Sequence, residues 1–386
     1  MRKTRGAPAS YACESDALDA EILTIVDDWH RHGVGLDEAV FTDLALRLFD
    51  YQFRYDRPYA AYCSALGVSP AAPPRSWYDI PAVPAAAFKD ATLATFDPAN
   101  AALVFDTSGT TARRAGRHFF ETAALYDAVL VAAFDRFMLP DGARLRYFNL
   151  VPNPDERATS SLGYMMRRVA SERGAGPAGW YLRGEALAVD ALTADLRAAV
   201  AARQAVCIAA TAFALAHVLD HLEREGLRFC LPPGSRLMET GGFKGRTRVV
   251  RREDLYRRLG DVFGVPQNAI VAEYGMTELT SQYYDDVLVR PNAASACVRT
   301  KVSPPWLRTR IVGTDGKALA RGTVGALVHV DLANRSSCIA IATEDLGVRL
   351  PESADAHAAD GIVLIGRESG AALRGCSLDA ESLLRQ

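Results

Sequence analysis

The segment Ala269-Ile270-Val271-Ala272 is a short apolar run, and Glu273-Tyr274-Gly275-Met276-Thr277-Glu278 follows it without a break. Such a run predicts a strand buried in a sheet. The six residues after it offer an aromatic ring that can stack on a base, a Thr hydroxyl that can bind a phosphate, and a Glu carboxylate that can hold Mg²⁺. An ordinary strand-to-helix turn is the alternative when this segment is taken by itself.

Two further segments place polar side chains directly after an expected strand. The strand Ala102–Phe105 leads into Asp106-Thr107-Ser108-Gly109-Thr110-Thr111, and the strand Ile339–Thr343 leads into Thr343-Glu344-Asp345-Leu346-Gly347. Backbone N–H groups and hydroxyls of a small-residue loop can donate to phosphate oxygens, and Gly allows a close approach. An Asp in such a turn can accept two ribose hydroxyls, although residues of these types are also common in plain turns.

Around these segments, short β-rich runs alternate with longer helical runs. We expect strands at Tyr147–Val151 and Ala205–Ala209, and helices at Thr122–Phe137, Val189–Ala202, Phe213–Glu225 and Arg252–Phe263. This alternation favours an α/β fold in which much of the sheet is parallel. Residues 15–66 have apolar residues at helical spacing, and the stretch from Cys297 to Val348 is β-rich, with strands expected at Leu307–Val312 and Gly325–Asp331.

Composition narrows the class of protein. Hydrophobic residues make up 49% of the 386 residues and charged residues 23%, so we expect a sizeable core. The formal net charge of -2 gives no reason to expect a nucleic-acid partner. The seven cysteines are scattered and show no Cys-x-x-Cys pair, which favours neither a disulfide framework nor a zinc site. No signal peptide or apolar run of membrane-spanning length is present, and a reducing cytoplasm is the expected location.

The order and spacing of the three polar segments, followed by Gly366-Arg367, resemble the acyl- and aryl-adenylating superfamily. That superfamily includes acyl-CoA ligases, peptide-synthetase adenylation domains and luciferases. The resemblance implies an α/β fold, the large domain of an adenylate-forming, acyl-CoA synthetase-like enzyme, that uses ATP and Mg²⁺. It also implies a site residue at each matching position.

The implied roles follow the motifs. The loop after Asp106 resembles the phosphate loop, and Gly241-Gly242 resembles the glycine pair that lies beside the adenine. Tyr274 would stack on the adenine, Thr277 would bind phosphate, and Glu278 would hold Mg²⁺. Asp345 would bind the ribose, and Arg367 would begin the hinge to a mobile subdomain. The implied nucleotide-binding set is Thr107, Ser108, Gly109, Thr110, Thr111, Gly241, Gly242, Tyr274, Gly275, Thr277, Asp345 and Arg367.

The chain departs from the superfamily in two places. The phosphate loop usually continues Gly-x-Pro-Lys, whereas here it continues Ala112-Arg113-Arg114-Ala115-Gly116. The sequence extends only about twenty residues beyond Arg367. The superfamily's C-terminal subdomain is several times longer and carries a Lys that aids adenylation, so we expect a truncated C-terminal subdomain.

A narrower resemblance accounts for this truncation. The acyl-protein synthetases of bacterial bioluminescence, the LuxE-type long-chain-fatty-acid–luciferin-component ligases, end equally early. The resemblance covers most of the chain from about residue 75. It rests on Ile80-Pro81-Ala82-Val83-Pro84 with Phe88-Lys89, Ser160-Ser161-Leu162, Gly241-Gly242-Phe243-Lys244, Val302-Ser303-Pro304-Pro305-Trp306, Asp331-Leu332-Ala333-Asn334 and Arg374-Gly375-Cys376-Ser377-Leu378. In that family the Cys of the last motif accepts the acyl group, which implies Cys376 as the nucleophile.

The surroundings of Cys376 suit this role. Nearby cations such as Arg374 and Arg367 lower the pKa of a thiol and raise its thiolate fraction; an inert small residue is the alternative. Lys244 is a candidate catalytic cation that would offset charge on the reacting carboxylate or the α-phosphate, or else a solvated surface Lys. His118, a lone His, is expected to be structural. Ser161 has no evident His and acid partners of a hydrolase.

We therefore expect a helical N-terminal part in residues 1–90, an adenylate-forming core in residues 91–366 and a short remnant with the acceptor Cys in residues 367–386. The expected reaction converts a fatty or aryl carboxylic acid to acyl-AMP and transfers the acyl group to Cys376. A partner such as an acyl reductase would then receive it. Transfer to coenzyme A, a carrier protein or an amine is the first alternative. A non-catalytic nucleotide-binding subunit of a reductase complex is the second.

Overall fold

The computed structural model describes residues 9–107, 115–184, 186–241, 251–290, 299–349 and 361–367. Eight α-helices lie in this part of the chain: α1 Ala9–His32, α2 Glu38–Tyr55, α3 Arg57–Ala65, α4 Ala124–Met138, α5 Ser161–Arg173, α6 Val189–Ala201, α7 Ala212–Arg224 and α8 Arg252–Phe263. Short 3₁₀ helices are η1 Trp77–Asp79, η2 Ala85–Lys89, η3 Pro98–Asn100 and η4 Gln267–Ala269. No helix in the described ranges is both long and apolar enough to cross a membrane.

Most of the described strands belong to one mixed sheet, in the order β12-β13-β14-β15-β11-β10-β9-β8-β7-β4-β5-β6, with β1 beside β14. A separate hairpin pairs β2 with β3. The strands are β1 Val83–Pro84, β2 Leu103–Asp106, β3 Arg117–Phe120, β4 Arg146–Pro152, β5 Gly179–Arg183, β6 Ala186–Leu187, β7 Val206–Thr211, β8 Arg236–Thr240, β9 Ile270–Tyr274, β10 Tyr283–Asp285, β11 Lys301–Val302, β12 Leu307–Val312, β13 Gly325–Asp331, β14 Ala340–Arg349 and β15 Ile362–Arg367.

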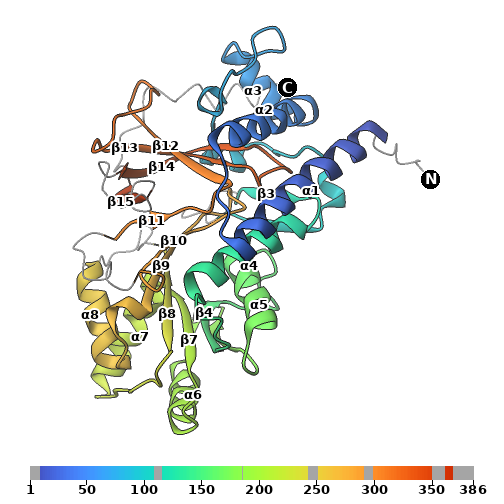
Figure 1. Cartoon of the computed structure of the whole chain (residues 1–386). Helices are drawn as coiled ribbons and strands as arrows, with labels where there is room; N and C mark the ends of the chain where they lie inside the picture. The colour runs from blue at the N-terminus through green and yellow to red at the C-terminus, as the bar shows by residue number, and fades with distance from the viewer. Residues whose placement is uncertain are drawn as a thin grey trace.

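One half of the sheet is parallel and is covered on both faces. The strands β5, β4, β7, β8 and β9 are parallel neighbours. Helices α4 and α5 lie on one side of these strands, and α7 and α8 lie on the other (Figure 1). Helices α5 and α7 start at side-chain caps, where Ser160 accepts from Gly163 N and Thr211 accepts from Ala214 N. This half confirms the predicted alternation of strands and helices in a parallel sheet.

The other half is antiparallel and bends back toward the first. In sheet order β13 stands five strands away from β9, yet the Tyr274 hydroxyl of β9 lies 3.1 Å from His329 Nε2 of β13. Side chains from distant strands therefore meet inside the curve of the sheet. This meeting brings motifs that are far apart in sequence to one place.

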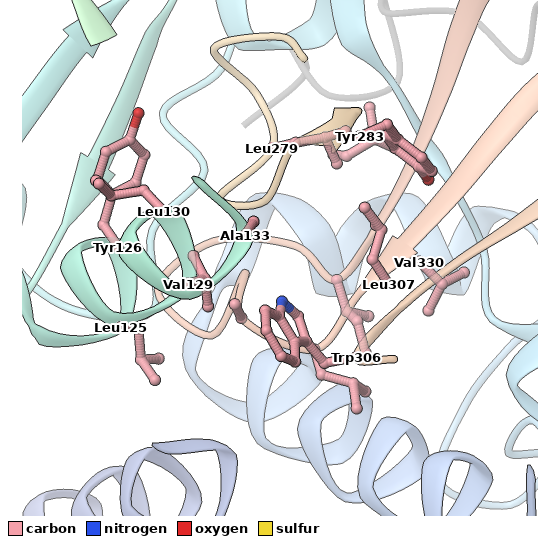
Figure 2. Packing of buried hydrophobic residues seen from close by; sticks show 14 of the residues in the cluster. Leu125, Tyr126, Val129, Leu130, Ala133, Leu279, Tyr283, Trp306, Leu307 and Val330 are labelled. Atoms are coloured by element: carbon pink, nitrogen blue, oxygen red, sulfur yellow. The ribbon is translucent and has the colours of Figure 1, made fainter. Parts of the chain in front are cut away.

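The core continues from the sheet into the N-terminal helices. Trp306 is fully buried, packs edge-to-face on Trp29 of α1 at 5.2 Å between ring centroids, and donates from Nε1 to Ser281 Oγ at 2.9 Å. Figure 2 shows its indole between α4, which carries Val129, and the strands that carry Leu307 and Val330. A buried Trp needs a partner for its N–H, and Ser281 supplies it.

One expected turn is wrong. Strand β14 was expected to end at Thr343, with Asp345 in the turn after it, but the strand continues to Arg349. Its second half pairs with β15, and Asp345 stands opposite Arg367. The local sequence could not indicate this, because strand extent depends on pairing with residues distant in sequence. The boundaries of the three expected parts of the chain stay a prediction.

Candidate functional site

The carboxyl ends of β8 and β9 lie side by side at one edge of the parallel sheet. β8 ends at Thr240, next to Gly241, and β9 ends at Tyr274, next to Gly275. Gly241 has φ +67°, in the left-handed region that favours glycine, and a Cβ there would meet nothing within 4 Å. In open α/β sheets, ligands bind beyond this edge of the strands. The expected adenine-side residues Gly241 and Tyr274 thus share the edge where a ligand would lie.

Glu273 shapes the start of the loop that follows β9. Its buried carboxylate accepts a hydrogen bond from the Thr240 hydroxyl. A Cβ at Gly275 would lie 2.5 Å from Glu273 Oε1. A Cβ there would displace the Glu273 carboxylate, so glycine lets the chain pass over it without a shift, a structural reason for Gly275 that is independent of any ligand.

The expected adenine and ribose residues meet directly. Tyr274 donates a hydrogen bond from its hydroxyl to Asp345 Oδ2 at 2.9 Å, although the two are 71 residues apart. Asp345 N donates to Thr343 Oγ1 at 3.1 Å, and the backbone of Asp345 is in register with Arg367. The fold therefore brings together Tyr274, Asp345 and the backbone of Arg367, three of the positions that the resemblance singled out.

Thr277 lies where the loop after β9 approaches the β2–β3 hairpin. Its hydroxyl is 3.5 Å from the Asp106 carbonyl oxygen and 3.5 Å from Ser161 Oγ, both long for hydrogen bonds. Its carbonyl accepts a 2.8 Å hydrogen bond from His118 Nδ1, so His118 Nε2 accepts from the Ser337 hydroxyl at 2.9 Å. Burial lowers the pKa of His118 to about 4, which agrees with its expected structural role.

Thr107 closes the base of the expected phosphate loop. It is buried, donates from its N to Gly116 O at 2.8 Å, and accepts from Gly116 N on Oγ1 at 3.1 Å. A Cβ at Gly116 would lie 2.5 Å from Phe88 O, so this glycine lets the hairpin pack on η2. The expected loop therefore starts from a fixed base that includes the Phe88-Lys89 motif.

A latch formed by Asp331 and Asn334 holds the loop that follows Glu278. Asp331 accepts from Thr280 N, Ser281 N and Ser281 Oγ at 3.1, 2.8 and 2.9 Å. Asn334 accepts from Thr280 N at 2.8 Å and donates to Glu278 O at 2.9 Å. Burial raises the pKa of Asp331 to about 6, although these hydrogen bonds oppose the shift.

The sequence analysis singled out the motif of Asp331 and Asn334 but did not predict its role as a latch. Asx side chains directly after an apolar strand are a signal for hydrogen bonds to nearby backbone, and Asp331 stands at the end of β13. The partner segment, residues 278–281, lies about fifty residues earlier in the chain. Sequence spacing alone does not show that partner.

A second set of residues that sequence reasoning missed fixes β9 just before Tyr274. Lys301 Nζ donates to Ala272 O at 2.7 Å and to Asp285 Oδ1, while Asp285 Oδ2 accepts from Ala272 N at 3.1 Å. Burial opposes the charge on Asp285, but Lys301 and Arg299 hold its pKa below the ordinary value. The buried Lys301 and Asp285 thus bind the carbonyl and the N–H of Ala272, respectively.

The other expected site residues lie outside the described residues: Ser108, Gly109, Thr110, Thr111, Gly242, Lys244 and Cys376. Glu278 is described and buried, with 9% of its surface exposed. No group of three His, Cys, Asp or Glu residues in the described ranges is placed to hold a metal ion by itself.

Comparison with solved structures gives the fold. The chain is similar to 2-hydroxyisobutyryl-CoA ligase in an open conformation with 2-HIB-AMP and CoA, with TM-score 0.62, 14% identity and coverage of 88% of this chain and 76% of that one. The same ligase in the postadenylation state, with R3-HIB-AMP, gives TM-score 0.61, 13% identity, and coverage of 86% and 67%. The match to McyG A-PCP with phenylalanyl-adenylate has TM-score 0.49 and 17% identity. It covers 71% of this chain and 42% of that one, so the chain spans less than half of that relative. At these identities the likeness is one of fold, that of the adenylate-forming enzymes.

Comparison with curated proteins gives no match. The model of a protein family, described as acyl-protein synthetase, LuxE, matches residues 186–384, which is over half of the chain. It includes β8, β9 and β14, the strands that carry Gly241, Tyr274 and Asp345 to one place. With this match, the chain belongs to the LuxE acyl-protein synthetase family.

Proposed function

We propose that this protein activates a carboxylic acid with ATP as the acyl-AMP and then transfers the acyl group to its own Cys376. The observation that carries the proposal is the 2.9 Å hydrogen bond between Tyr274 and Asp345, at the strand edge where Thr277 meets the β2–β3 hairpin. Three polar segments from distant parts of the sequence converge there. Membership of the acyl-protein synthetase family supports the same reaction.

In the proposed complex, the Tyr274 ring stacks on the adenine beside Gly241, and Asp345 accepts the ribose hydroxyls. The loop that begins at Thr107 and the Thr277 hydroxyl bind the phosphates, and Arg367 lies next to the ribose. A phosphate-binding loop of backbone N–H groups and hydroxyls needs a base that is fixed in the fold. The tight closure between Thr107 and Gly116 provides one.

Glu278 would hold Mg²⁺. The ion commonly takes one or two protein carboxylates and completes its shell with substrate phosphates and water. The buried carboxylate of Glu278 fits that donor set, and the latch holds the Glu278 backbone in place. The bound ion would neutralise charge on the triphosphate.

The first step forms a bond between a carboxylate oxygen of the acid and the α-phosphorus, and the bond to pyrophosphate breaks. In the second, the Cys376 sulfur attacks the acyl carbon, the bond from carbon to the AMP oxygen breaks, and AMP leaves with the electron pair. The thiol has lost its proton to solvent before the attack, because the thiolate is the nucleophile. Lys244 is proposed to offset charge on the carboxylate or the α-phosphate. The product thioester stays activated for a partner such as an acyl reductase.

The experiment separates the two steps. A Cys376→Ser variant should keep acid-dependent ATP–pyrophosphate exchange, because the adenylating residues lie elsewhere in the chain. It should lose the hydroxylamine-sensitive acyl group, which intact-mass measurement after incubation with ATP and a panel of fatty and aryl acids would show. A Ser hydroxyl is a much weaker nucleophile than a thiolate at neutral pH.

Cys230→Ser is the matched control, since Cys230 is exposed and lies far from the three segments in sequence. It should be acylated like the wild type. Acylation of another cysteine in place of Cys376 would overturn Cys376 as the acceptor. Transfer to coenzyme A that does not depend on Cys376 would replace self-acylation with the alternative ligase reaction. No pyrophosphate exchange with any acid would favour the non-catalytic nucleotide-binding subunit.

A further inference from the structure

A buried hydrogen-bond chain stands behind the pair formed by Tyr274 and Asp345. The Tyr274 hydroxyl lies 3.1 Å from His329 Nε2. On the other side of the imidazole, Nδ1 lies 2.8 Å from the Tyr283 hydroxyl and 3.0 Å from Thr309 Oγ1. The last two hydroxyls are 2.5 Å apart. His329 is fully buried, and Tyr283 and Thr309 are almost completely so.

The number of protons available fixes the direction of these hydrogen bonds. A carboxylate accepts hydrogen bonds and does not donate them, so the single hydroxyl proton of Tyr274 goes to Asp345. The Tyr274 oxygen can then only accept from His329, which places the imidazole proton on Nε2. Nδ1 is left as an acceptor, and Tyr283 or Thr309 donates to it. Every donor in the chain therefore points toward Asp345.

The imidazole has the protonation state that this direction requires. Burial lowers the pKa of His329 to about 4, although the nearby Asp345 carboxylate opposes the shift. The ring is therefore neutral near pH 7, with one N–H and one lone pair. A doubly protonated ring would have no lone pair for the hydroxyls at Nδ1.

The sheet arranges the four hydrogen-bonded residues as two pairs on neighbouring strands. Tyr274 and Tyr283 are opposite each other on β9 and β10, and Thr309 and His329 are opposite each other on β12 and β13. Thr309 and His329 lie within β12 and β13, and Tyr274 and Tyr283 lie where the end of β9 meets the start of β10. The Tyr274 hydroxyl is thus held between His329 and Asp345.

We propose that His329 is a positioning residue for nucleotide recognition, which holds the Tyr274 hydroxyl as a donor to Asp345 and so orients that carboxylate toward the ribose. This inference rests on the proposed function, since it assigns His329 to the ribose subsite of the same site. His329 itself does not touch the nucleotide. Its effect passes through Tyr274, and the chain of hydroxyls behind it fixes the tautomer.

The test measures how well the full-length protein distinguishes a ribose with hydroxyls from one without. ATP and 2′,3′-dideoxy-ATP are titrated calorimetrically into the wild type, His329→Leu, Tyr274→Phe and the double variant. Losing one oriented hydrogen bond should weaken ATP binding about 3- to 10-fold. Binding of the dideoxy nucleotide should hardly change, because it has no hydroxyls for Asp345 to accept.

The double variant tests whether His329 acts through Tyr274. In a double-mutant cycle its ATP affinity should be no lower than that of either single variant, because both substitutions break the same link. Additive losses, or an equal loss for both nucleotides in His329→Leu, would overturn the positioning role. Should His329→Leu fail to fold, His329→Gln replaces it. Its neutral amide can still donate to Tyr274, and it should restore most of the discrimination. A Gln variant that folds but discriminates no better than Tyr274→Phe would also overturn the role.

The wild type separates this inference from the function on which it rests. If it binds neither nucleotide, the proposed function fails and this inference fails with it. If it prefers ATP and His329→Leu keeps the full preference, the positioning role alone is wrong.

Discussion

A single buried carboxylate, that of Glu278, has the most specific proposed task at the residue scale. Glu278→Gln keeps the shape of the side chain and removes its charge. In the proposed reaction, losing this charge should raise the barrier to adenylation by about 2.7–4 kcal/mol, or about 10²- to 10³-fold in rate. Acid-dependent pyrophosphate exchange measures that rate.

Glu225→Gln is the control for this prediction, because Glu225 is exposed at the end of α7. It should exchange pyrophosphate at the wild-type rate. An unchanged rate for Glu278→Gln under saturating Mg²⁺ would instead assign Glu278 to the support of its loop, where its carbonyl already accepts from Asn334.

The individual site residues show what sequence can predict at this scale. Residue type and motif order pointed to Tyr274, Thr277 and Asp345, and the fold brings Tyr274 within hydrogen-bond distance of Asp345. His329 and Asp331 were not assigned roles, because a polar residue on a strand looks the same whether it faces solvent or a partner. Only the tertiary fold supplies those partners.

At the scale of elements, His118 joins the β2–β3 hairpin to the loop after β9. Its pKa falls from the ordinary 6.5 to about 4, because burial disfavours the charged ring. Between these values the unfolded chain binds a proton that the folded chain does not. Stability is therefore lost as pH falls from 6.5 to 4, by up to about 3 kcal/mol from this residue.

The prediction is tested with His118→Asn, which keeps a donor for the Thr277 carbonyl. The difference in unfolding free energy between the wild type and this variant should shrink as pH falls from 7 to 4. Urea denaturation at several pH values measures it, with His217→Asn as the exposed control. A difference that stays constant over this range would contradict the buried, neutral state of His118.

Elements also show where sequence prediction fails. The helices and the parallel strands were close to their expected places, because apolar periodicity and capping residues determine them locally. The second half of β14 was taken for a turn, because its strand character comes from pairing with β13 and β15. The structure describes the expected phosphate loop only at its base, at Thr107, so its role in binding phosphate stays a prediction.

Across the whole molecule, Arg335 ties the N-terminal helices to the site. Its buried guanidinium donates to both oxygens of Asp19 in α1, at 2.7 and 2.9 Å, and to Glu121 after β3. Its neighbour Ser336 accepts from Glu121 N at 3.3 Å. The loop of the latch, the hairpin and α1 therefore share one charged junction.

Replacing the Arg335 side chain should lower the stability of the protein and loosen α1. Arg335→Met leaves Asp19 and Glu121 partly buried without their cation, which should cost about 3 kcal/mol of unfolding free energy. Limited proteolysis should then cut α1 more readily. Arg31→Met is the matched control, since its pair with Asp27 is exposed, and it should change stability by less than about 1 kcal/mol. Equal losses for the two variants would show that Arg335 is no junction.

The backbone pair between Asp345 and Arg367 also limits how far Cys376 can lie from the nucleotide site. Cys376 is the ninth residue after Arg367, and a fully extended chain of nine residues spans about 30 Å at most. One thiol confined within that radius has a local concentration on the order of 10 mM, whatever path the chain takes. In the proposed reaction, a free thiol would need a comparable concentration to compete for the acyl-AMP. If the proposed adenylation takes place, chain connectivity therefore favours transfer to Cys376 over release to a more dilute acceptor.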